Sequence, residues 1–267
     1  MRKTGIKFDL SWIYVWLVIL FLLFPLISIL FLSFSKTIYL EFPPSLFSIQ
    51  WYKDMVHNRR LLNSFFVSLR IAIPATLLAS FLGTLAALAS RNFGRKLSNA
   101  SHILFVAPLI VPYIILATGM SRLAILIGIR GMPAITLAHA TIALPYVFLL
   151  VNSGLQLLPE SVEEAARVLG AGQFTAVWKV TLPLIRPHIF VATMFAFIAS
   201  FGEFIIAYIL STPYATTLTV YIYGSIRDRQ EPSISALLTL ITVAVLFIGL
   251  FYARYYPVQQ RRQRVQI

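Results

Sequence analysis

Five polar side chains inside long apolar runs are the residues of this sequence that could act on a solute. Glu203 is a carboxylate among phenylalanine, isoleucine and alanine, and Thr193 and Ser200 precede it in the same run. His139 and Tyr146 share an earlier run. A carboxylate in such surroundings could attract a cationic solute, or neighbouring hydrogen-bond donors could hold it as a structural group. His139 is open to the same two interpretations, as a packing residue or as a ligand-binding residue.

A second polar segment, residues 159–187, separates two apolar runs. The proline that opens it predicts the end of one helix, and Ser161 with Glu164 has the S-x-x-E spacing of a capping box, which predicts the start of another. Glu163 and Arg167 are four residues apart and are predicted to pair on the exposed side of that helix. This polar helix is expected to be a docking surface for a partner outside the apolar layer.

Ala166 and Gly170 lie one helical turn apart in this segment and have almost no side chain. A glycine there costs about 1 kcal/mol of helix propensity relative to alanine, which indicates a specific reason for its presence. The two residues would let the helix fit closely into a groove. Alternatively, the segment is an ordinary helical loop that contains the letters Glu-Ala-Ala.

The composition indicates a membrane protein. Of 267 residues, 59% are hydrophobic and 12% are charged, and the mean hydropathy is +0.83. A helix of about 20 apolar residues crosses a hydrocarbon layer of about 30 Å, and the apolar runs do not alternate in polarity as barrel strands do. The sequence therefore predicts an all-α, polytopic protein with six transmembrane helices at residues 12–34, 61–89, 103–127, 134–158, 189–210 and 234–255.

Small and polar residues form stripes along two of these predicted helices. In the second span the stripe consists of Ala72, Thr76, Ala79, Gly83, Ala86 and Ser90. In the fifth span it consists of Thr193, Ala196, Ser200, Glu203 and Ala207. Such faces let helices pack closely in lipid, and they could also line a solute path. Pro108 and Pro112 fall inside the third span and can bend it.

The net charge of +13 resides in short basic clusters beside the apolar runs, so nucleic acid is not an expected partner. The positive-inside rule favours both termini in the cytoplasm. We expect a single transmembrane domain over residues 1–267, with a cytoplasmic N-terminus (1–11), an external loop (35–60), the cytoplasmic segment 159–187 and a basic cytoplasmic C-terminus (256–267). The external loop is predicted to hold an extended piece and then a short interfacial helix.

Three further features limit the possibilities. The first span is longer than the apolar core of a signal peptide, so it is predicted to be a retained helix. The chain has no cysteine, which excludes disulfides and thiolate metal sites. It also has no G-x-x-x-x-G-K-[ST] motif, so the chain is not expected to hold a nucleotide in a phosphate-binding loop of that kind.

The polar segment carries a spaced pattern formed by Glu164, Ala165, Ala166, Gly170, Val180, Leu182 and Pro183. The pattern resembles the EAA loop of permease subunits in ATP-binding cassette (ABC) importers of bacteria and archaea, the MetI-like family. Val180 stands where isoleucine is common. The six predicted spans, with this loop between the fourth and the fifth, resemble the same family.

Less specific motifs over nearly the whole chain resemble the spermidine/putrescine permease group of that family, the PotC-like subunits. They are residues 42–44, 51–52, 63–64, 107–112, 137–139, 145–146, 201–204 and 216–218. Related permeases for opines, aminophosphonates and other small solutes look similar. An acidic residue near the position of Glu203 also occurs in permeases for oxyanions.

The resemblance implies the type I ABC importer fold with a cytoplasmic coupling helix, in a bacterial inner membrane. The chain would form half of the pore, beside a second, homologous permease. Two ATPase subunits would bind ATP and Mg²⁺, and an extracytoplasmic solute-binding protein would deliver the solute. The chain itself would be non-catalytic, without cofactor or metal. The implied coupling residues are Ser161, Glu163, Glu164, Ala165, Ala166, Arg167, Gly170, Leu182 and Pro183, with Glu164 expected to pair with a basic residue of the ATPase.

The predicted solute is a polyamine or a related amine-bearing compound. The alternative is the same type of permease for an opine, an aminophosphonate, an amino-acid derivative or an oxyanion. A secondary transporter or channel would need ion-coupling sites and internal inverted repeats, which the sequence does not display. A membrane scaffold without transport is the third class of hypothesis.

Overall fold

The structure is a computed structural model that describes residues 10–36, 47–91, 95–228 and 233–264. These residues are almost entirely helical, with one isolated antiparallel bridge between Ser35 and Phe47. The elements are α1 (Leu10–Ser33), α2 (Gln50–His57), α3 (Arg59–Arg91), α4 (Arg95–Ile110), α5 (Tyr113–Leu126), α6 (Met132–Gln156), α7 (Glu160–Val168), α8 (Gln173–Ala176), a π-helical turn (Val177–Thr181), α9 (Leu182–Phe201), α10 (Ile205–Leu210), α11 (Leu218–Asp228) and α12 (Ser233–Arg264).

The prediction of an all-α, polytopic membrane protein is confirmed. Among the described residues, five helical stretches are long and apolar enough to cross a membrane, and a bent pair of helices raises the number to six if it counts as one span. The five stretches are Trp12–Ser33, Arg59–Arg91, Met132–Gln156, Gln173–Phe201 and Ser233–Phe251. The bent pair is Ala100–Ile110 with Tyr113–Leu126.

The third span is not the continuous helix expected at residues 103–127. It breaks at Val111 and Pro112, and the two halves are bent by 100°. Pro112 adopts an extended ψ of 132°, and it lacks the N–H that would continue α4. Proline also disfavours a helical conformation of the residue before it, here Val111. Pro108, in contrast, lies inside α4 without ending it.

The fifth span also differs from the helix predicted at residues 189–210. Its helical structure begins at Gln173 and ends at Phe201, so the second half of the segment 159–187 is helix rather than loop. After Phe201 the chain breaks and restarts as α10. Glu203 therefore lies in the break, and the prediction that it continues the helical face of Thr193 and Ser200 is wrong.

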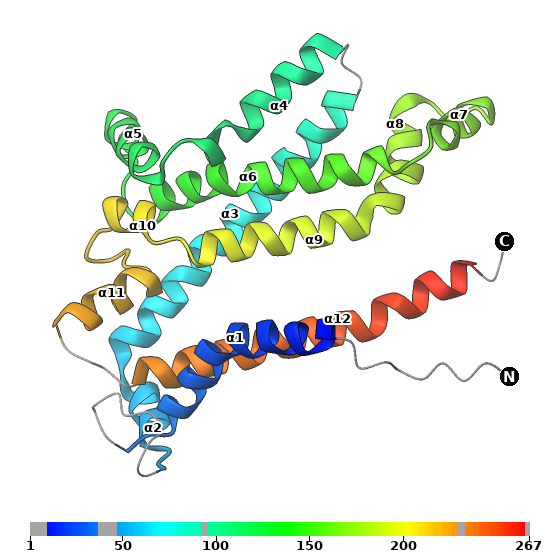
Figure 1. Ribbon diagram of the computed structural model, residues 1–267. Helices are drawn as coiled ribbons and strands as arrows, with labels where there is room; N and C mark the ends of the chain where they lie inside the picture. Colours follow the sequence, from blue (N-terminus) through cyan, green and yellow to red (C-terminus); the bar gives the residue numbers. More distant parts are fainter. Residues whose placement is uncertain (1–9, 37–46, 92–94, 229–232, 265–267) are drawn as a thin grey trace, which may run out of the picture. The chain divides into compact units, whose positions relative to one another are not determined.

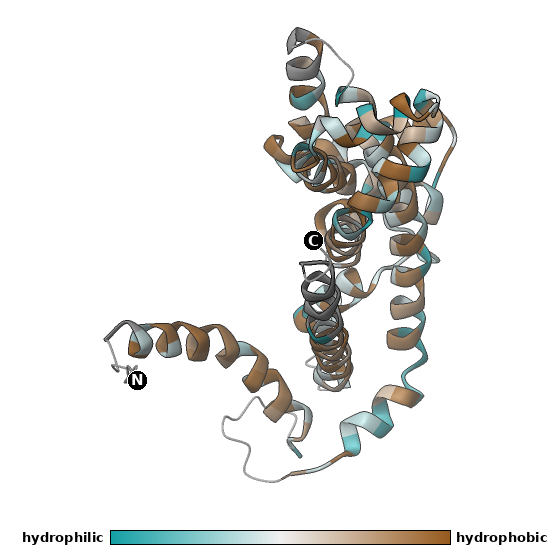
Figure 2. Ribbon diagram, turned by 90° about the vertical axis from the view of Figure 1, so that its right-hand side faces the viewer, coloured by the Kyte–Doolittle hydropathy of each residue, from teal (hydrophilic) through white to brown (hydrophobic). Residues whose placement is uncertain are grey.

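The chain forms two compact units, and the boundary between them falls within α3 and α11. One unit comprises residues 1–62 and 222–267. In it, α1 and α12 lie side by side, and the Ser33 Oγ and Tyr52 Oη atoms, 2.8 Å apart, join the end of α1 to α2. The α1 helix is apolar along its whole described length (Figure 2), and its large side chains are exposed, as expected of a helix that faces lipid.

The short helix predicted within residues 35–60 is present in the structure. It is α2, which contains Trp51 and Tyr52. The proline pair at residues 43–44, predicted as an extended piece, lies outside the described residues. At the other end of this unit, α12 continues to Arg264, so the predicted basic tail at 256–267 is helical over most of its length.

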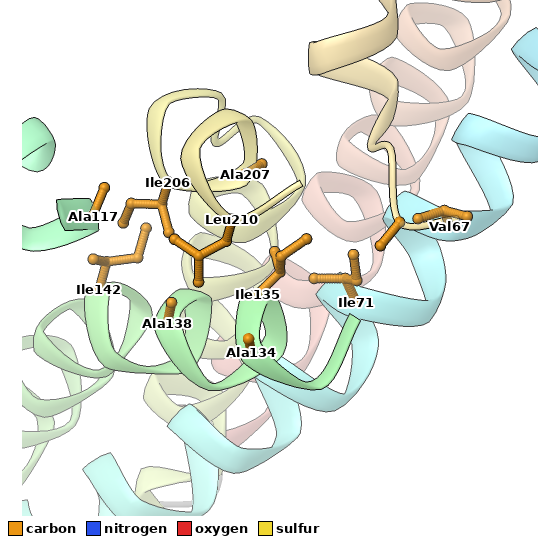
Figure 3. Close-up of a cluster of buried hydrophobic side chains, with 11 residues drawn as sticks. Val67, Ile71, Ala117, Ala134, Ile135, Ala138, Ile142, Ile206, Ala207 and Leu210 are labelled. Atoms are coloured by element: carbon orange, nitrogen blue, oxygen red, sulfur yellow. The ribbon is translucent and has the colours of Figure 1, made fainter. Parts of the chain in front are cut away.

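The second unit, residues 63–221, contains every residue proposed for function. Its two central helices, α6 and α9, pack side by side, with α7 and α8 at one end and α5 and α10 at the other (Figure 1). One apolar cluster joins α6, α10, α5 and α3 (Figure 3), with Ile71, Ile135, Ile142 and Ile206 fully or almost fully buried. A second cluster around Phe148 joins α6 to α9.

Two glycines allow α6 to approach its neighbours closely. A Cβ atom added to Gly154 would lie 2.5 Å from Cγ and 2.8 Å from Cβ of His188 on α9. A Cβ atom added to Gly83 on α3 would lie 2.8 Å from Cβ of Val147 on α6. Gly83 belongs to the predicted small-residue stripe of the second span, so part of that stripe serves helix packing.

We predict that Gly154→Ala destabilises the protein by about 1–3 kcal/mol, the range typical of overpacked cores. Rotation of the His188 side chain cannot relieve the clash, because its Cβ atom is itself too close. Gly249→Ala on α12 is the matched control, since a Cβ atom there meets nothing within 4 Å. Thermal unfolding of the two purified variants tests this, and equal melting temperatures would contradict the close packing of α6 on α9.

Candidate functional site

The segment between α6 and α9 is a short helix, α7, connected to a longer one by a glycine-containing turn. Pro159 precedes α7 as its N-cap residue, with no side-chain hydrogen bond to the helix start. The predicted capping box of Ser161 and Glu164 is therefore wrong: Pro159, with φ −60° and ψ 136°, is the N-cap residue, so α7 begins at Glu160, before Ser161. Both residues lie within the helix and are exposed.

The two adjacent carboxylates of α7 have different surroundings. Glu163 accepts a hydrogen bond from Arg91 Nη1 at the end of α3, at 2.7 Å, and another from the hydroxyl of Thr181. The predicted pairing of Glu163 with Arg167 is thus replaced by a tertiary ion pair, because α3 brings a guanidinium to the inner side of α7. Glu164 is exposed and is available to a partner.

The outer surface of α7 and the following turn combines charge with exposed apolar groups. Arg167 is exposed beside Val168 and Leu169, which are 87% and 88% exposed. Phe174 and Trp178 stack on each other with ring centroids 6.2 Å apart, and they are also exposed. Val168 and Leu169, exposed beside charged side chains, form a candidate docking surface, whereas Phe174 and Trp178 belong to the stretch Gln173–Phe201, which is apolar enough to cross a membrane. The interface residues implied by the resemblance thus lie on one continuous stretch of chain, residues 161–183.

Gly170 ends the helical segment in a conformation that other residues rarely adopt. Its φ is +90°, and its N–H donates to Arg167 O at 2.9 Å. The next N–H, of Ala171, donates to Ala166 O at 3.0 Å, which closes the end of α7. The predicted close packing at Gly170 is not visible within this chain, because a Cβ atom there would meet nothing within 4 Å. Leu182 and Pro183 follow the π-helical turn and begin α9.

The second candidate site is the break between α9 and α10. Glu203 is only 6% exposed, and its two carboxylate oxygens accept hydrogen bonds from the N–H groups of Ile206 (3.0 Å) and Ala207 (2.9 Å). These are two of the donors that a helix start leaves without partners inside the helix. The Glu203 side chain thus stabilises the start of α10, which explains why the helix restarts there.

His139 connects this carboxylate to the end of α9. Its Nε2 atom lies 3.4 Å from Glu203 Oε2, and its Nδ1 atom lies 3.0 Å from Ser200 Oγ. All three side chains are buried. The structure therefore brings together three of the five residues singled out in the sequence, and it places hydrogen-bonding partners around the buried carboxylate.

The other two residues of the predicted path lie apart from this cluster or at its edge. Thr193 Oγ1 lies 3.0 Å from Ser80 Oγ on α3 and donates to Ile189 O, so it serves the contact of α9 with α3. Tyr146 lies on α6 near Tyr113 of α5, and both side chains lie at the edge of the Glu203 cluster.

Arg91, Thr181, Ser80 and Tyr113 are partners that the sequence did not single out. Arg91 and Thr181 lie 72 and 18 residues from Glu163, so no local spacing connects them. Of these four residues, only Arg91 could have been suspected from the sequence, because it is a basic residue at the end of an apolar span. Among the described residues there is no group of three His, Cys, Asp or Glu side chains that could hold a metal ion.

Comparison with known proteins places this geometry in a family. Residues 75–265 match the family described as "binding-protein-dependent transport system inner membrane component". The chain is 36% identical over 229 residues to the putrescine transport system permease protein PotI of Escherichia coli K12, which covers 82% of this chain and 80% of PotI. It is 30% identical over 202 residues to the spermidine/putrescine transport system permease protein PotC of the same strain, with 75% and 76% covered.

The fold has a solved counterpart at low sequence identity. The crystal structure of a bacterial alginate ABC transporter, in complex with an alginate-bound periplasmic protein, contains a chain that superposes with a TM-score of 0.70 at 17% identity. The match covers 91% of both chains. The family match, the two relatives and the shared helical fold together establish that this multi-pass membrane protein belongs to the binding-protein-dependent transport system inner membrane components and is an ABC importer permease.

Proposed function

We propose that this permease imports a polyamine, such as putrescine or spermidine, or a related amine-bearing solute. The observation that carries the proposal is its identity of 36% and 30% to permeases named for putrescine and for spermidine and putrescine, over at least three quarters of each protein. A buried carboxylate in the membrane part of the chain, that of Glu203, is consistent with a cationic solute.

The ATPase subunits of the complex dock on α7 and the turn after it. The support for this part of the proposal is the division of α7 into an inner side, held by Glu163, and an outer side that carries Glu164, Arg167, Val168 and Leu169. The outer side offers one exposed carboxylate and a set of apolar side chains, which suit a groove lined by basic and apolar groups. Ser161, Ala165, Ala166, Leu182 and Pro183 complete the expected docking segment.

The remaining parts of the proposal concern the assembly. Two ATPases bind ATP and Mg²⁺, a second and homologous permease forms the other half of the pore, and an extracytoplasmic binding protein delivers the solute. We infer from the distribution of basic residues that both termini and α7 face the cytoplasm. Within the second unit, α5 and α10 lie at the end opposite to α7 (Figure 1). The whole chain then serves as one transmembrane permease domain in the inner membrane.

Within the membrane, we assign Glu203, His139, Ser200, Tyr146 and Thr193 to the solute path. Two backbone N–H groups donate hydrogen bonds to the carboxylate of Glu203 and favour its charged form. The charge attracts a cation over several ångströms in a medium of low dielectric constant. Direct contact with the solute is not required for this effect.

The first test concerns docking. We expect Glu164→Lys to weaken co-purification of the ATPase by about tenfold and to lower uptake, because it places like charges opposite each other in the proposed interface. Arg122→Gln, which changes an exposed charge on α5 at the other end of the unit, is the control and leaves ATPase binding unchanged. Normal co-purification and uptake with Glu164→Lys would refute docking on α7.

The second test concerns the turn. Gly170→Ala forces alanine into the left-handed region, which costs about 1 kcal/mol and shifts the end of α7. We expect faster amide hydrogen exchange in residues 166–171 and weaker ATPase binding. Gly172→Ala is the control, since Gly172 has an ordinary φ of −64° and open space around it. Equal exchange rates and equal binding in the two variants would contradict the role given to Gly170.

The third test concerns the solute. Glu203→Gln keeps an oxygen for one of the two α10 N–H groups and removes the charge, so we expect an assembled complex with about tenfold slower putrescine uptake. Glu203→Ala, which removes both hydrogen bonds, is expected to destabilise the complex by about 1–3 kcal/mol. Unchanged putrescine kinetics in Glu203→Gln would assign Glu203 to structure alone, and uptake of only an anionic solute would favour the oxyanion alternative.

A further inference from the structure

One carboxylate joins three helical elements of the second unit. Oε1 of Glu163 on α7 accepts hydrogen bonds from Arg91, the last residue of α3, and from Thr181, the last residue of the π-helical turn before α9. The side chains of Arg91 and Glu163 are 23% and 18% exposed, and Thr181 is fully buried. Because the pair is mostly shielded from water, salt and solvent weaken it less than they weaken a surface ion pair.

The α7 helix depends on such an anchor. It has nine residues and no side-chain hydrogen bond at its N-cap, and helices of fewer than about 12 residues are marginal in isolation. Its outer side is exposed, and a Cβ atom at Gly170, in the turn after it, would meet nothing within 4 Å. Glu163 therefore supplies a polar tertiary connection that fixes α7 to two long helices at once.

The two helices that Glu163 joins are also connected deeper in the membrane. Ser80 of α3 and Thr193 of α9 are within hydrogen-bonding distance at 3.0 Å. Further along α9, Ser200 contacts His139, which lies beside Glu203. A displacement of α7 that is transmitted through Glu163 would thus move α3 and α9 together, and α9 leads directly to the break that holds Glu203.

The π-helical turn is a second reason to expect that a movement of α7 reaches α9 through Thr181. A π-turn inserts an extra residue into a helix, and such turns occur frequently at functional positions. Here it lies between α8 and α9, and its last side chain is the one that donates to Glu163. The anchor is therefore attached at the beginning of the regular helix, which can move as a rigid element.

We propose that the junction of Glu163, Arg91 and Thr181 couples the movement of α7 to α3 and α9, so that Arg91 is a positioning residue for coupling ATP hydrolysis to transport. The proposal rests on the proposed docking of the ATPase on α7. It differs from docking itself, because Arg91 belongs to α3 and faces the inner side of α7. Loss of the junction is expected to leave a complex that hydrolyses ATP but moves less solute.

The experiment compares Arg91→Gln, Arg91→Lys and the charge exchange Arg91→Glu with Glu163→Arg in the complete transporter. For each complex, ATPase co-purification, ATP hydrolysis and putrescine uptake in proteoliposomes are measured. We expect Arg91→Gln to keep the ATPase bound but to lower uptake per ATP by about tenfold, within the range usual for coupling between sites. Arg91→Lys and the charge exchange are expected to recover most of the loss.

The outcomes separate this proposal from the proposed function. Unchanged uptake per ATP in Arg91→Gln overturns the proposal, and so does a charge exchange that assembles but recovers nothing. If all three variants fail to assemble, the junction serves folding and the proposal is also overturned. Glu164→Gln is the matched control on the neighbouring residue: it is expected to weaken ATPase co-purification, and normal co-purification there contradicts the docking on α7 whatever Arg91 does.

Discussion

The need to satisfy backbone hydrogen bonds in hydrocarbon governs this structure. A membrane offers no water to an exposed N–H or carbonyl group, so a spanning chain is helical wherever it meets lipid. Where α9 ends inside the unit, the chain meets the same requirement with a side chain. The carboxylate of Glu203 accepts hydrogen bonds from the N–H groups of Ile206 and Ala207 in the first turn of α10. The hydroxyl of Thr219 donates to the carbonyl of Glu203. An irregular segment can thus exist within an apolar unit.

The break between α4 and α5 meets the same need for backbone hydrogen bonds. At Pro112 the ring removes a donor from the helix, and the carbonyl of Pro112 then accepts from the N–H groups of Ile115 and Leu116 to start α5. Both breaks lie at the end of the unit that also contains α5 and α10, where a transporter needs backbone that is not confined to straight helices. The opposite end, with α7, is built of short helices held by side-chain contacts.

The helices of the second unit are joined by two kinds of contact, close packing at small residues and hydrogen-bonded polar pairs. Small residues such as Gly83 and Gly154 bring α6 within direct contact of α3 and α9, so these helices cannot shift independently without opening voids. Polar pairs fix the register at separate heights: Arg91 with Glu163, Ser80 with Thr193, and His139 with Ser200. A chain of this kind can move between two packed arrangements rather than deform gradually.

Much of the fold could be predicted from the sequence, because it rests on local properties. The apolar runs predicted the membrane helices, and the spacing from Glu164 to Pro183 indicated the family. Local rules failed where the deciding partner was distant in the sequence. The S-x-x-E spacing predicted a cap at Ser161, but Pro159 already began the helix. The four-residue spacing predicted a partner for Glu163 within α7, but Arg91 is the partner.

The sequence by itself determined that the chain has several membrane helices and to which family it belongs, since hydropathy and residue spacing are properties of the chain alone. Only the tertiary structure decided which of the two adjacent carboxylates of α7 faces inward, and that Glu203 caps a new helix instead of continuing an old one. The physical reason is that a buried charge must find its hydrogen-bond donors, and folding brings those donors from other helices or from a restarted backbone.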